Sequence, residues 1–241
     1  MTARLQDLVC LISGGHQGIG AAIVEAYRAE GAIVVSADWK NDDAMVDDCY
    51  WTRRLDVTRK SEWQSLTSEI TASFGRIDIL VNNAGTTGWA SIHDVDDTEW
   101  DRIINVNQRG THYGMASVAE GMISRRRGSI INISSIFGSR AVANLAAYHA
   151  SKAAVLGMTR NAAITYAPHA VRVNAILPGW IATPMTAGQA DELNQEFIGR
   201  TPMNRGGTPN EIAAAAVFLG ANESSFVTGV ELPVDGGYLA L

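Results

Sequence analysis

The sequence has few of the residues on which several common functional classes depend. Its two cysteines, Cys10 and Cys49, are too few for a disulfide scaffold or a zinc cage, and we expect no metal ion. No apolar run approaches the roughly 18 residues that a membrane span requires, and the first residues lack the basic and apolar regions of a signal peptide. We therefore expect a soluble protein of the cytoplasm, a reducing compartment, with Cys10 as a small core residue.

Positive charge is also scarce. The 241 residues carry a formal net charge of −6 and have a pI near 5.3, which argues against nucleic acid or an anionic membrane as the main partner. The basic run at 125–127 is expected to be a solvated helix end. Hydrophobic residues make up 46% and charged residues 18% of the chain, so it can bury a sizeable core. Its length suits one large domain or at most two small ones.

Two side chains four residues apart, Tyr148 and Lys152, lie in an alanine-rich segment that is expected to be helical. At that spacing they share one face of the helix. An ammonium beside a phenol favours the phenolate and lowers a pKa that starts at about 10, which makes the tyrosine a usable general acid or base. Ser135 follows a strand-like run at 129–134, where its hydroxyl could hydrogen-bond the same substrate oxygen as Tyr148. A tyrosine and a lysine at this spacing also occur by chance on surface helices, so the rest of the chain must decide whether the pair is catalytic.

A glycine-rich turn at 13–20, S-G-G-H-Q-G-I-G, connects a buried strand at 8–13 with a helix at 21–29. A strand, a turn and a helix N-terminus form an anion site, because unpaired backbone N–H groups point outward there. The glycines let the backbone approach a pyrophosphate closely. The spacing is G-x-x-x-G-x-G rather than the more common G-x-G-x-x-G. Its place between strand and helix predicts dinucleotide binding rather than an ordinary turn.

The second strand-like run, 32–37, is followed by Asp38. A carboxylate at this position can accept hydrogen bonds from the adenosine ribose hydroxyls and would repel a 2′-phosphate. Gln17 and Trp39 are uncharged and offer a 2′-phosphate no partner, whereas Lys40 is one nearby cation. We predict NAD rather than NADP as the cofactor.

Strands and helices alternate along the whole chain, with no linker, repeat or break in composition. Further strands are expected at 50–55, 77–81, 129–134, 171–177 and 227–234, with helices at 59–74, about 94–124, about 148–166 and 208–219. This alternation predicts an α/β fold with a single Rossmann-type, doubly wound, mostly parallel sheet and helices on both faces. We expect one domain over 1–241.

Three stretches allow two interpretations each. The run N-N-A-G at 82–85 can tie strands together and line a cofactor cleft, or it can be an ordinary turn. Asn107 inside a helix indicates either a local kink that frees a carbonyl or surface exposure, since asparagine competes with the backbone for hydrogen bonds. The segment 185–207 has weak periodicity, which indicates a substrate-binding loop or lid, with a pair of surface helices as the alternative.

In this order and at these separations, the motifs resemble those of the short-chain dehydrogenase/reductase family over essentially the whole chain. The glycine spacing is the one that this family uses, and Ser13 stands where threonine is usual, which keeps the hydroxyl. The resemblance rests on 13–20, Asp56-Val57, N-N-A-G at 82–85, Asn107, Ser135, Y-H-A-S-K at 148–152 and P-G-W-I-A-T at 178–183.

The resemblance implies a catalytic role for four residues. Tyr148 would exchange a proton with the substrate oxygen, and Ser135 would stabilise that oxygen. Lys152 would lower the pKa of Tyr148 and hold the nicotinamide ribose. Asn107 would anchor a water for proton relay. We choose Ser135 rather than Ser134 because its separation of 13 residues from Tyr148 matches the family pattern.

The resemblance also implies a cofactor site assembled from the loops that follow the strands. Pyrophosphate would be held by Gly14, Gly18, Ile19 and Gly20, the adenosine ribose by Asp38, adenine by Asp56 and Val57, and the nicotinamide carboxamide by Ile181 and Thr183. Asn83 would line the cleft, and the same motifs add Gln17, Ala84, Gly85, Tyr148, Lys152, Pro178 and Gly179.

The predicted reaction is reversible hydride transfer between a secondary alcohol carbon and a nicotinamide, with proton transfer through Tyr148. The segments expected to face the small-molecule substrate are mostly apolar, which favours a medium-sized alicyclic or aromatic alcohol or ketone. A sugar would need more polar groups. For each aromatic residue, packing in the core or lid is the alternative. The substrate-contact candidates are Trp89, Asn144, Leu145, Trp180 and Met185, with Phe137, Phe197 and Gln189 beside them.

The same residues bear on alternative functions. An NADPH-dependent acyl-carrier-protein ketoreductase is disfavoured by Asp38, and only 125–127 and Arg172 hint at the basic docking surface it needs. A dinucleotide-sensing regulator without catalysis, or a purely structural module, would not need the complete catalytic set.

Members of the family usually pair their long helices and C-terminal strands. The apolar C-terminus, 238–241, suits such an interface, and we predict a homotetramer.

Overall fold

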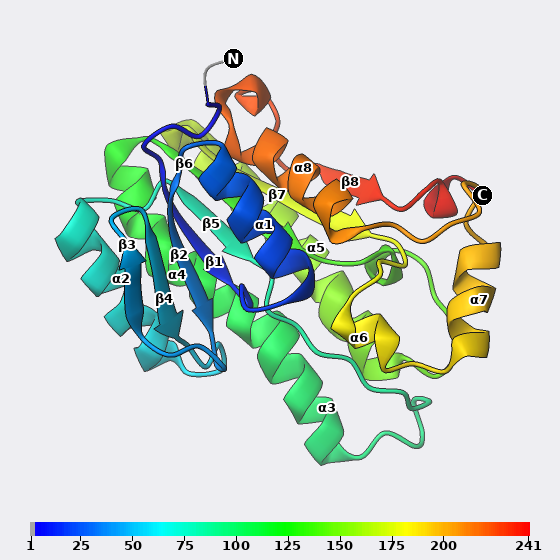
Figure 1. Ribbon diagram of the computed structural model, residues 1–241. Coiled ribbons are helices and arrows are strands. Elements are labelled where there is room, and N and C mark those ends of the chain that lie inside the picture. Colours follow the sequence, from blue (N-terminus) through cyan, green and yellow to red (C-terminus); the bar gives the residue numbers. More distant parts are fainter. Residues whose placement is uncertain (1–2) are drawn as a thin grey trace.

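The computed structural model describes residues 3–241. Its centre is one eight-stranded sheet with the strand order β3-β4-β2-β1-β5-β6-β7-β8 (Figure 1). Every neighbouring pair is parallel except β3 and β4, which are antiparallel. The order reverses between β1 and β5, as in a doubly wound sheet. The strands are β1 (Val9–Ser13), β2 (Ile33–Asp38), β3 (Ala44–Asp47), β4 (Tyr50–Arg54), β5 (Ile79–Asn82), β6 (Gly128–Ile133), β7 (Val171–Pro178) and β8 (Glu231–Val234).

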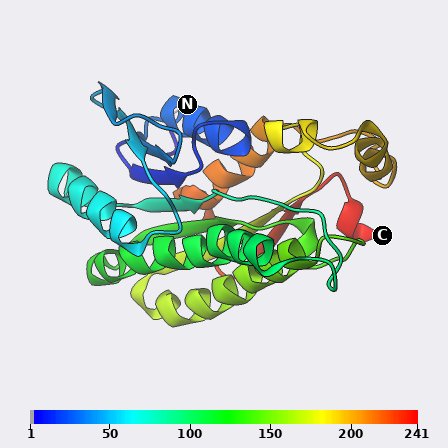
Figure 2. The same ribbon diagram turned by 90° about the horizontal axis from the view of Figure 1, so that it is seen from below.

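Helices cover both faces of the sheet, which confirms the predicted fold class (Figure 2). One face is covered by α1 and α8 and the other by α2, α4 and α5. The helices are α1 (Gly18–Ala29), α2 (Lys60–Phe74), α3 (Asp97–Ile103), α4 (Gly110–Arg125), α5 (Ala146–Tyr166), α6 (Pro184–Ala187), α7 (Asp191–Gly199) and α8 (Pro209–Gly220), with a π-helical turn η1 (Ile104–Arg109) and short 3-10 turns η2 (Ile136–Gly138), η3 (Ala167–His169), η4 (Asn222–Ser224) and η5 (Tyr238–Ala240).

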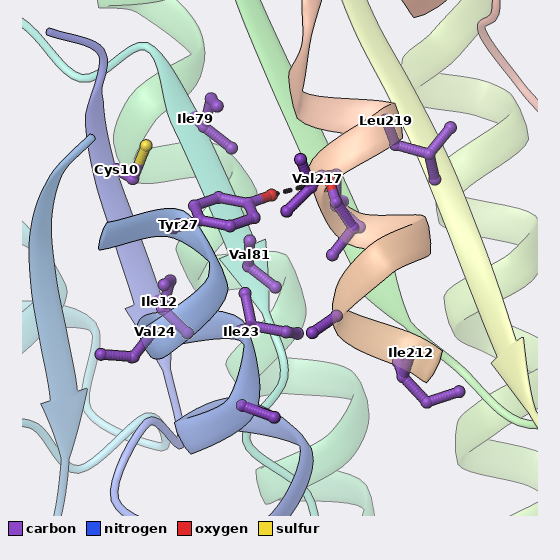
Figure 3. Close-up of a cluster of buried hydrophobic side chains, with 14 of the residues drawn as sticks. Cys10, Ile12, Ile23, Val24, Tyr27, Ile79, Val81, Ile212, Val217 and Leu219 are labelled. Carbon is purple, nitrogen blue, oxygen red and sulfur yellow. Dashed lines mark hydrogen bonds between the residues drawn. The ribbon is translucent and has the colours of Figure 1, made fainter. Parts of the chain in front are cut away.

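The core consists of an apolar layer on each side of the sheet. In the layer under α1 and α8, Tyr27 is fully buried, and its hydroxyl donates to the carbonyl of Ala216 at 2.9 Å (Figure 3). This bond joins the two helices and satisfies a polar group that burial would otherwise leave without a partner. Cys10 is buried in the same layer, as predicted. Strands β1 and β2 are buried on both faces, which explains their nearly unbroken apolar sequences.

The structure differs from the sequence prediction at three elements. Strand β3 was not predicted, because all four of its side chains are exposed and its sequence carries no alternating pattern. Strand β8 begins at Glu231 rather than 227. The segment 185–207 contains α6 and α7, so the alternative of a helix pair describes its secondary structure.

None of the helices in the described part of the chain combines the length and the hydropathy needed to cross a membrane. Within residues 3–241 there is also no group of three or more histidine, cysteine or acidic side chains that could hold a metal ion.

Candidate active site

The carboxyl ends of the parallel strands meet at one edge of the sheet, and a cleft of about 870 Å³ opens there. In a doubly wound sheet this is the edge at which ligands bind. Of the predicted cofactor residues only Gly20 does not line the cleft. The cofactor candidates that line it are Gly14, Gln17, Gly18, Ile19, Asp38, Asp56, Val57, Asn83, Ala84, Gly85, Tyr148, Lys152, Pro178, Gly179, Ile181 and Thr183.

The loop between β1 and α1 has the conformation that its glycines predict. Gly14 and Gly18 have φ of +68° and +58°, a region that favours glycine. A Cβ on Gly14 would lie 2.7 Å from the Cα of Ala84, and one on Gly20 would lie 1.9 Å from the carbonyl oxygen of Gly14. Gly20 therefore acts by allowing the turn to close. The first N–H groups of α1 receive no side-chain cap from Gln17, so this backbone cradle fits a pyrophosphate.

Asn83 ties the end of β5 to this loop. Its side-chain amide donates to the carbonyls of Ser13 at 3.1 Å and Gly14 at 2.9 Å. The Ser13 hydroxyl in turn donates to Val81 and accepts the backbone N–H of Asn83 at 3.2 Å. The amide run at 82–85 therefore joins neighbouring strand ends, which is the first of its two interpretations, and Ser13 uses the hydroxyl that it shares with threonine.

Asp38 lies at the end of β2, and its carboxylate accepts the N–H of Lys40 at 3.0 Å. The Lys40 ammonium lies over the exposed ring of Trp39, 5.4 Å from its centroid. Arg54, which the sequence reasoning missed, pairs in register with Asp38 and also lines the cleft. Pairing the predicted strands 32–37 and 50–55 in parallel would have indicated it.

Asp56 continues the same wall of the cleft. Burial opposes ionisation of this side chain, but hydrogen bonds from Thr58 and from Arg59 prevail and lower the pKa of Asp56. Asp56 is therefore an ionised acceptor at neutral pH, next to Val57 at the end of the cleft that the adenosine is expected to occupy.

Helix α5 places Tyr148 and Lys152 on the face that lines the cleft. Lys152 is only 4% exposed, and its ammonium donates to the carbonyl of Ile133 at 3.0 Å and lies 5.7 Å from the centroid of the Tyr148 ring. Burial lowers the pKa of Lys152 to about 8.

Burial also raises the pKa of Tyr148, although a hydrogen bond with Ser135 acts in the opposite direction. The net direction corrects the expectation that pairing with Lys152 lowers this pKa. In the protein alone, the desolvation of the phenol dominates, because a buried phenolate loses more hydration than its neighbours replace.

Two adjacent serines at the end of β6 have different partners. The hydroxyl of Ser134 donates to the carbonyl of Lys152 at 3.0 Å and so anchors α5 to the sheet. The hydroxyl oxygen of Ser135 accepts the backbone N–H of Phe137 at 3.1 Å, so its own proton can be donated toward Tyr148 or toward a substrate oxygen beside it. These contacts favour Ser135 over Ser134 as the serine that acts on a substrate.

Asn107 lies in the π-helical turn η1 and is 1% exposed, so the kink is the correct interpretation and surface exposure is wrong. Its side-chain oxygen accepts the N–H of Thr86 at 2.8 Å, and its amide donates to the carbonyl of Thr86 and to the hydroxyl of Ser151. It stands behind the cleft wall, where a Cβ on Gly85 would lie 3.4 Å from the Asn107 oxygen and 3.5 Å from the Lys152 nitrogen.

Beyond Tyr148 the cleft is mainly apolar and aromatic. Asn144 is the one substrate candidate that does not line it: this residue is exposed and has φ of +62°, a turn conformation that asparagine tolerates. Tyr238 does line it, although the sequence indicated only an interface role for the C-terminus. No local signal could reveal this, because β8 carries Tyr238 there from the far end of the chain. The side chains of this wall are Trp89, Phe137, Leu145, Trp180, Met185, Phe197 and Tyr238, with Gln189 as a polar member.

Comparison with known proteins agrees with this geometry. Residues 14–239 match a family model described as enoyl-(acyl carrier protein) reductase, a short-chain dehydrogenase/reductase model. The chain belongs to the short-chain dehydrogenase/reductase family. Its relatives include a 3-oxoacyl-[acyl-carrier-protein] reductase of Thermotoga maritima, 38% identical with 97% of this chain and 98% of the relative covered. A 3-alpha-(or 20-beta)-hydroxysteroid dehydrogenase of Mycobacterium tuberculosis is 39% identical, with 100% and 92% covered. A cyclopentanol dehydrogenase of Comamonas testosteroni is 38% identical, with 98% and 99% covered.

Solved structures of the family superpose on nearly the whole chain. Levodione reductase has a TM-score of 0.93 at 31% identity, with 98% of this chain and 99% of that chain covered. The aldohexose dehydrogenase of Thermoplasma acidophilum has a TM-score of 0.91 at 35% identity, with 100% and 97% covered. This family member is therefore an oxidoreductase that interconverts secondary alcohols and ketones with a nicotinamide dinucleotide.

Proposed function

We propose that the protein is an NAD-dependent dehydrogenase of a medium-sized, mostly apolar secondary alcohol, alicyclic or aromatic, and reduces the corresponding ketone in reverse. The apolar wall beyond Tyr148 carries this proposal, because it offers broad hydrophobic contact and few hydrogen-bonding groups. Relatives named for cyclopentanol and for hydroxysteroids support a ring-shaped substrate.

The preference for NAD is supported by Asp38, whose carboxylate lines the cleft at the end of β2. Such a group accepts hydrogen bonds from ribose hydroxyls and repels a 2′-phosphate. The Lys40 ammonium lies over Trp39, and Arg59 pairs with Asp56. Arg54 is the cation of this part of the cleft that works against the preference. The glycine loop and the N-terminus of α1 would hold the pyrophosphate, and the nicotinamide, when bound, supplies or accepts the hydride.

Side chains of the protein itself carry out the proton transfer. During ketone reduction the Tyr148 hydroxyl donates its proton to the substrate oxygen, and during alcohol oxidation it takes that proton back. Ser135 accepts the Phe137 N–H and so directs its own proton at the same substrate oxygen. The charged form of Lys152 favours the Tyr148 phenolate that oxidation needs. The Ile133 carbonyl holds this ammonium in place.

Asn107 is the proposed anchor of the water that relays protons to Lys152 and Tyr148. Both groups of its side-chain amide are engaged with Thr86 and Ser151, so the proposed water of the proton relay would bind at its backbone carbonyl. That carbonyl accepts the Thr111 hydroxyl at 2.7 Å. A carbonyl oxygen has two lone pairs, so it can accept a water beside this hydroxyl.

Reduction of an acyl-carrier-protein substrate is the second candidate, because one relative and the family model are described in those terms. The basic groups that hinted at it lie at the opposite edge of the sheet, at the amino ends of the strands. Arg125 donates to the carbonyl of Ile77, just before β5 begins, and Arg172 lies at the start of β7 and donates to the carbonyl of Leu219. A carrier protein docked there would be on the wrong side for delivering an acyl chain to Tyr148.

Initial rates with a panel of alcohols and ketones test the proposal. Cyclopentanol, cyclohexanol, 1-phenylethanol, a hexose and a 3-hydroxyacyl thioester would each be run with NAD⁺ and with NADP⁺. We expect the cyclic and aromatic alcohols with NAD⁺ to have the highest kcat/KM. A preference for the thioester with NADP⁺ would support the ketoreductase instead, and no turnover of any alcohol would indicate a regulator.

A further inference from the structure

We propose that His149 is a positioning residue that fixes the apolar wall of the substrate cleft and so selects ring-shaped over small acyclic ketones. This inference rests on the proposed function for the class of substrate, and on the contacts of His149 for the mechanism. The residue is the immediate neighbour of Tyr148 on α5, and its ring contacts the loop that follows Ser135.

The imidazole of His149 joins α5 to two points of that loop. Its Nδ1 lies 2.6 Å from the carbonyl oxygen of Phe137. Because a carbonyl only accepts, Nδ1 must carry a proton and donate it. The other nitrogen, Nε2, lies 3.1 Å from the backbone nitrogen of Val142 and 3.2 Å from its carbonyl oxygen. The shorter contact of Nδ1 places the proton there, so Nε2 accepts the Val142 N–H. One side chain therefore satisfies two backbone groups of residues 136–145, which apart from the short turn η2 have no helix or strand to hold them.

Phe137 is the central side chain of the apolar wall. Its ring packs edge-on against the His149 ring at 5.5 Å between centroids, and it also contacts Phe197 at 5.4 Å and Tyr238 at 6.3 Å. These partners come from α5, from α7 and from the C-terminal turn. Displacement of Phe137 would therefore disturb the contact point of three separate elements.

The backbone of Phe137 also contacts Ser135, the proposed catalytic serine. The Phe137 N–H donates to Ser135, while its carbonyl accepts from His149. Arg140, farther along the loop, donates to the carbonyl of Leu241, so the loop is attached to the C-terminus as well. A wall held in this way is formed before a substrate arrives, which avoids the entropic cost of ordering it on binding.

The expected effect of loosening the wall depends on the substrate. Cyclohexanone would contact the wall, whereas 2-butanone can react at Tyr148 and Ser135 with much less contact. His149→Ala should therefore raise KM for cyclohexanone about tenfold, the scale of a lost apolar contact. It should change kcat for cyclohexanone, and kcat/KM for 2-butanone, by less than about threefold.

Two further variants complete the design. His149→Asn retains a donor where Nδ1 stands, so it should keep the Phe137 bond and restore KM for cyclohexanone to within about threefold of wild type. Ala150→Ser, at the exposed neighbouring position of α5, is the matched control and should behave as wild type. Hydrogen exchange of a peptide covering 136–145 reports on the wall without any substrate. It should be faster in His149→Ala than in wild type or the control.

Each result bears on one of the two proposals. Equal losses for both ketones, unchanged KM for cyclohexanone, or unchanged exchange at 136–145 would overturn the role of His149. If His149→Ala does not fold, His149→Leu replaces it, because leucine fills similar space without a hydrogen-bonding group. A raised KM for cyclohexanone together with faster exchange at 136–145 supports the role, and wild-type values of both contradict it. A wild-type enzyme without turnover of either ketone contradicts the proposed function, while the exchange measurement still tests His149.

Discussion

At the scale of single residues, the catalytic helix carries two polar groups whose pKa values both move because of burial. Tyr148 is held in its neutral form more strongly than a free phenol, and burial lowers the pKa of Lys152 from 10.5 to about 8. Their titrations are coupled once they share a substrate, so a pH–rate profile would report the pair. The consequences for catalysis and for stability can be tested separately.

Replacing Tyr148 by phenylalanine removes only the proton donor. We expect kcat to fall by at least about 100-fold, the scale of general acid–base catalysis, while the affinity for NAD stays within a few-fold. Steady-state kinetics and a fluorescence titration with NADH measure the two effects. Tyr166→Phe, farther along α5, is the control and should retain full activity. A Tyr148→Phe enzyme that still turns over would refute the assignment of the proton donor.

Lys152 makes a pH-dependent contribution to stability. Because burial lowers its pKa in the folded protein from 10.5 to about 8, the folded state disfavours the charged form. The penalty is complete below about pH 8 and disappears as the pH approaches 10.5. Relative to Lys152→Met, the wild-type free energy of unfolding should therefore rise by about 2–3 kcal/mol between pH 7.5 and 10. Urea denaturation of both proteins at each pH measures this difference, and parallel curves would contradict it.

At the scale of elements, the turn between β1 and α1 depends on glycines that cannot be replaced, because neighbouring atoms leave no room for a Cβ. In Gly20→Ala the new methyl group would collide with the backbone of Gly14, which cannot move without displacing Ala84 and Asn83. We expect a loss of about 1–3 kcal/mol of stability and at least a tenfold weaker affinity for NADH.

Gly199→Ala is the matched control for this substitution. A Cβ on Gly199 would meet nothing within 4 Å, and the residue lies in the last turn of α7. The control should unfold at the wild-type temperature or slightly above it, since alanine is the better helix former. A Gly20→Ala protein that binds NADH as the control does would contradict the role of the turn as a phosphate cradle.

At the scale of the whole molecule, several large apolar side chains remain exposed on the single chain. Ile164 on α5 is 79% exposed, and Phe226, which precedes β8, is fully exposed. They lie on the long helix and at the C-terminal strand, the two places where we predict copies of the chain to pair. Burial of such side chains between copies would remove apolar area from water.

Light scattering tests the predicted homotetramer. We expect a mass of about four times the 25.8 kDa of one chain, and a smaller assembly for Phe226→Asp. Met45→Asp, at the exposed strand β3 on the opposite edge of the sheet, should leave the assembly unchanged. A wild-type mass of one chain would refute the tetramer.

The sequence by itself determined the fold class, the glycine turn, the places of Asp38 and Ser135 after their strands, and the shared helical face of Tyr148 and Lys152. Those inferences succeed because they depend on local properties: the period of apolar residues, the freedom of glycine, and the position of a residue one turn along a helix or at the end of a strand. Parallel strands then bring their carboxyl ends to the same edge, whatever lies between them in the chain.

Only the tertiary structure decided which side chains complete the site. It brought Tyr238 and Arg54 to the cleft, left Asn144 outside it, and buried Asn107 in a π-helical turn. It also reversed the expected direction of the Tyr148 pKa. These outcomes depend on contacts between distant segments and on how far each group is removed from water, and no pattern within one segment encodes either of them.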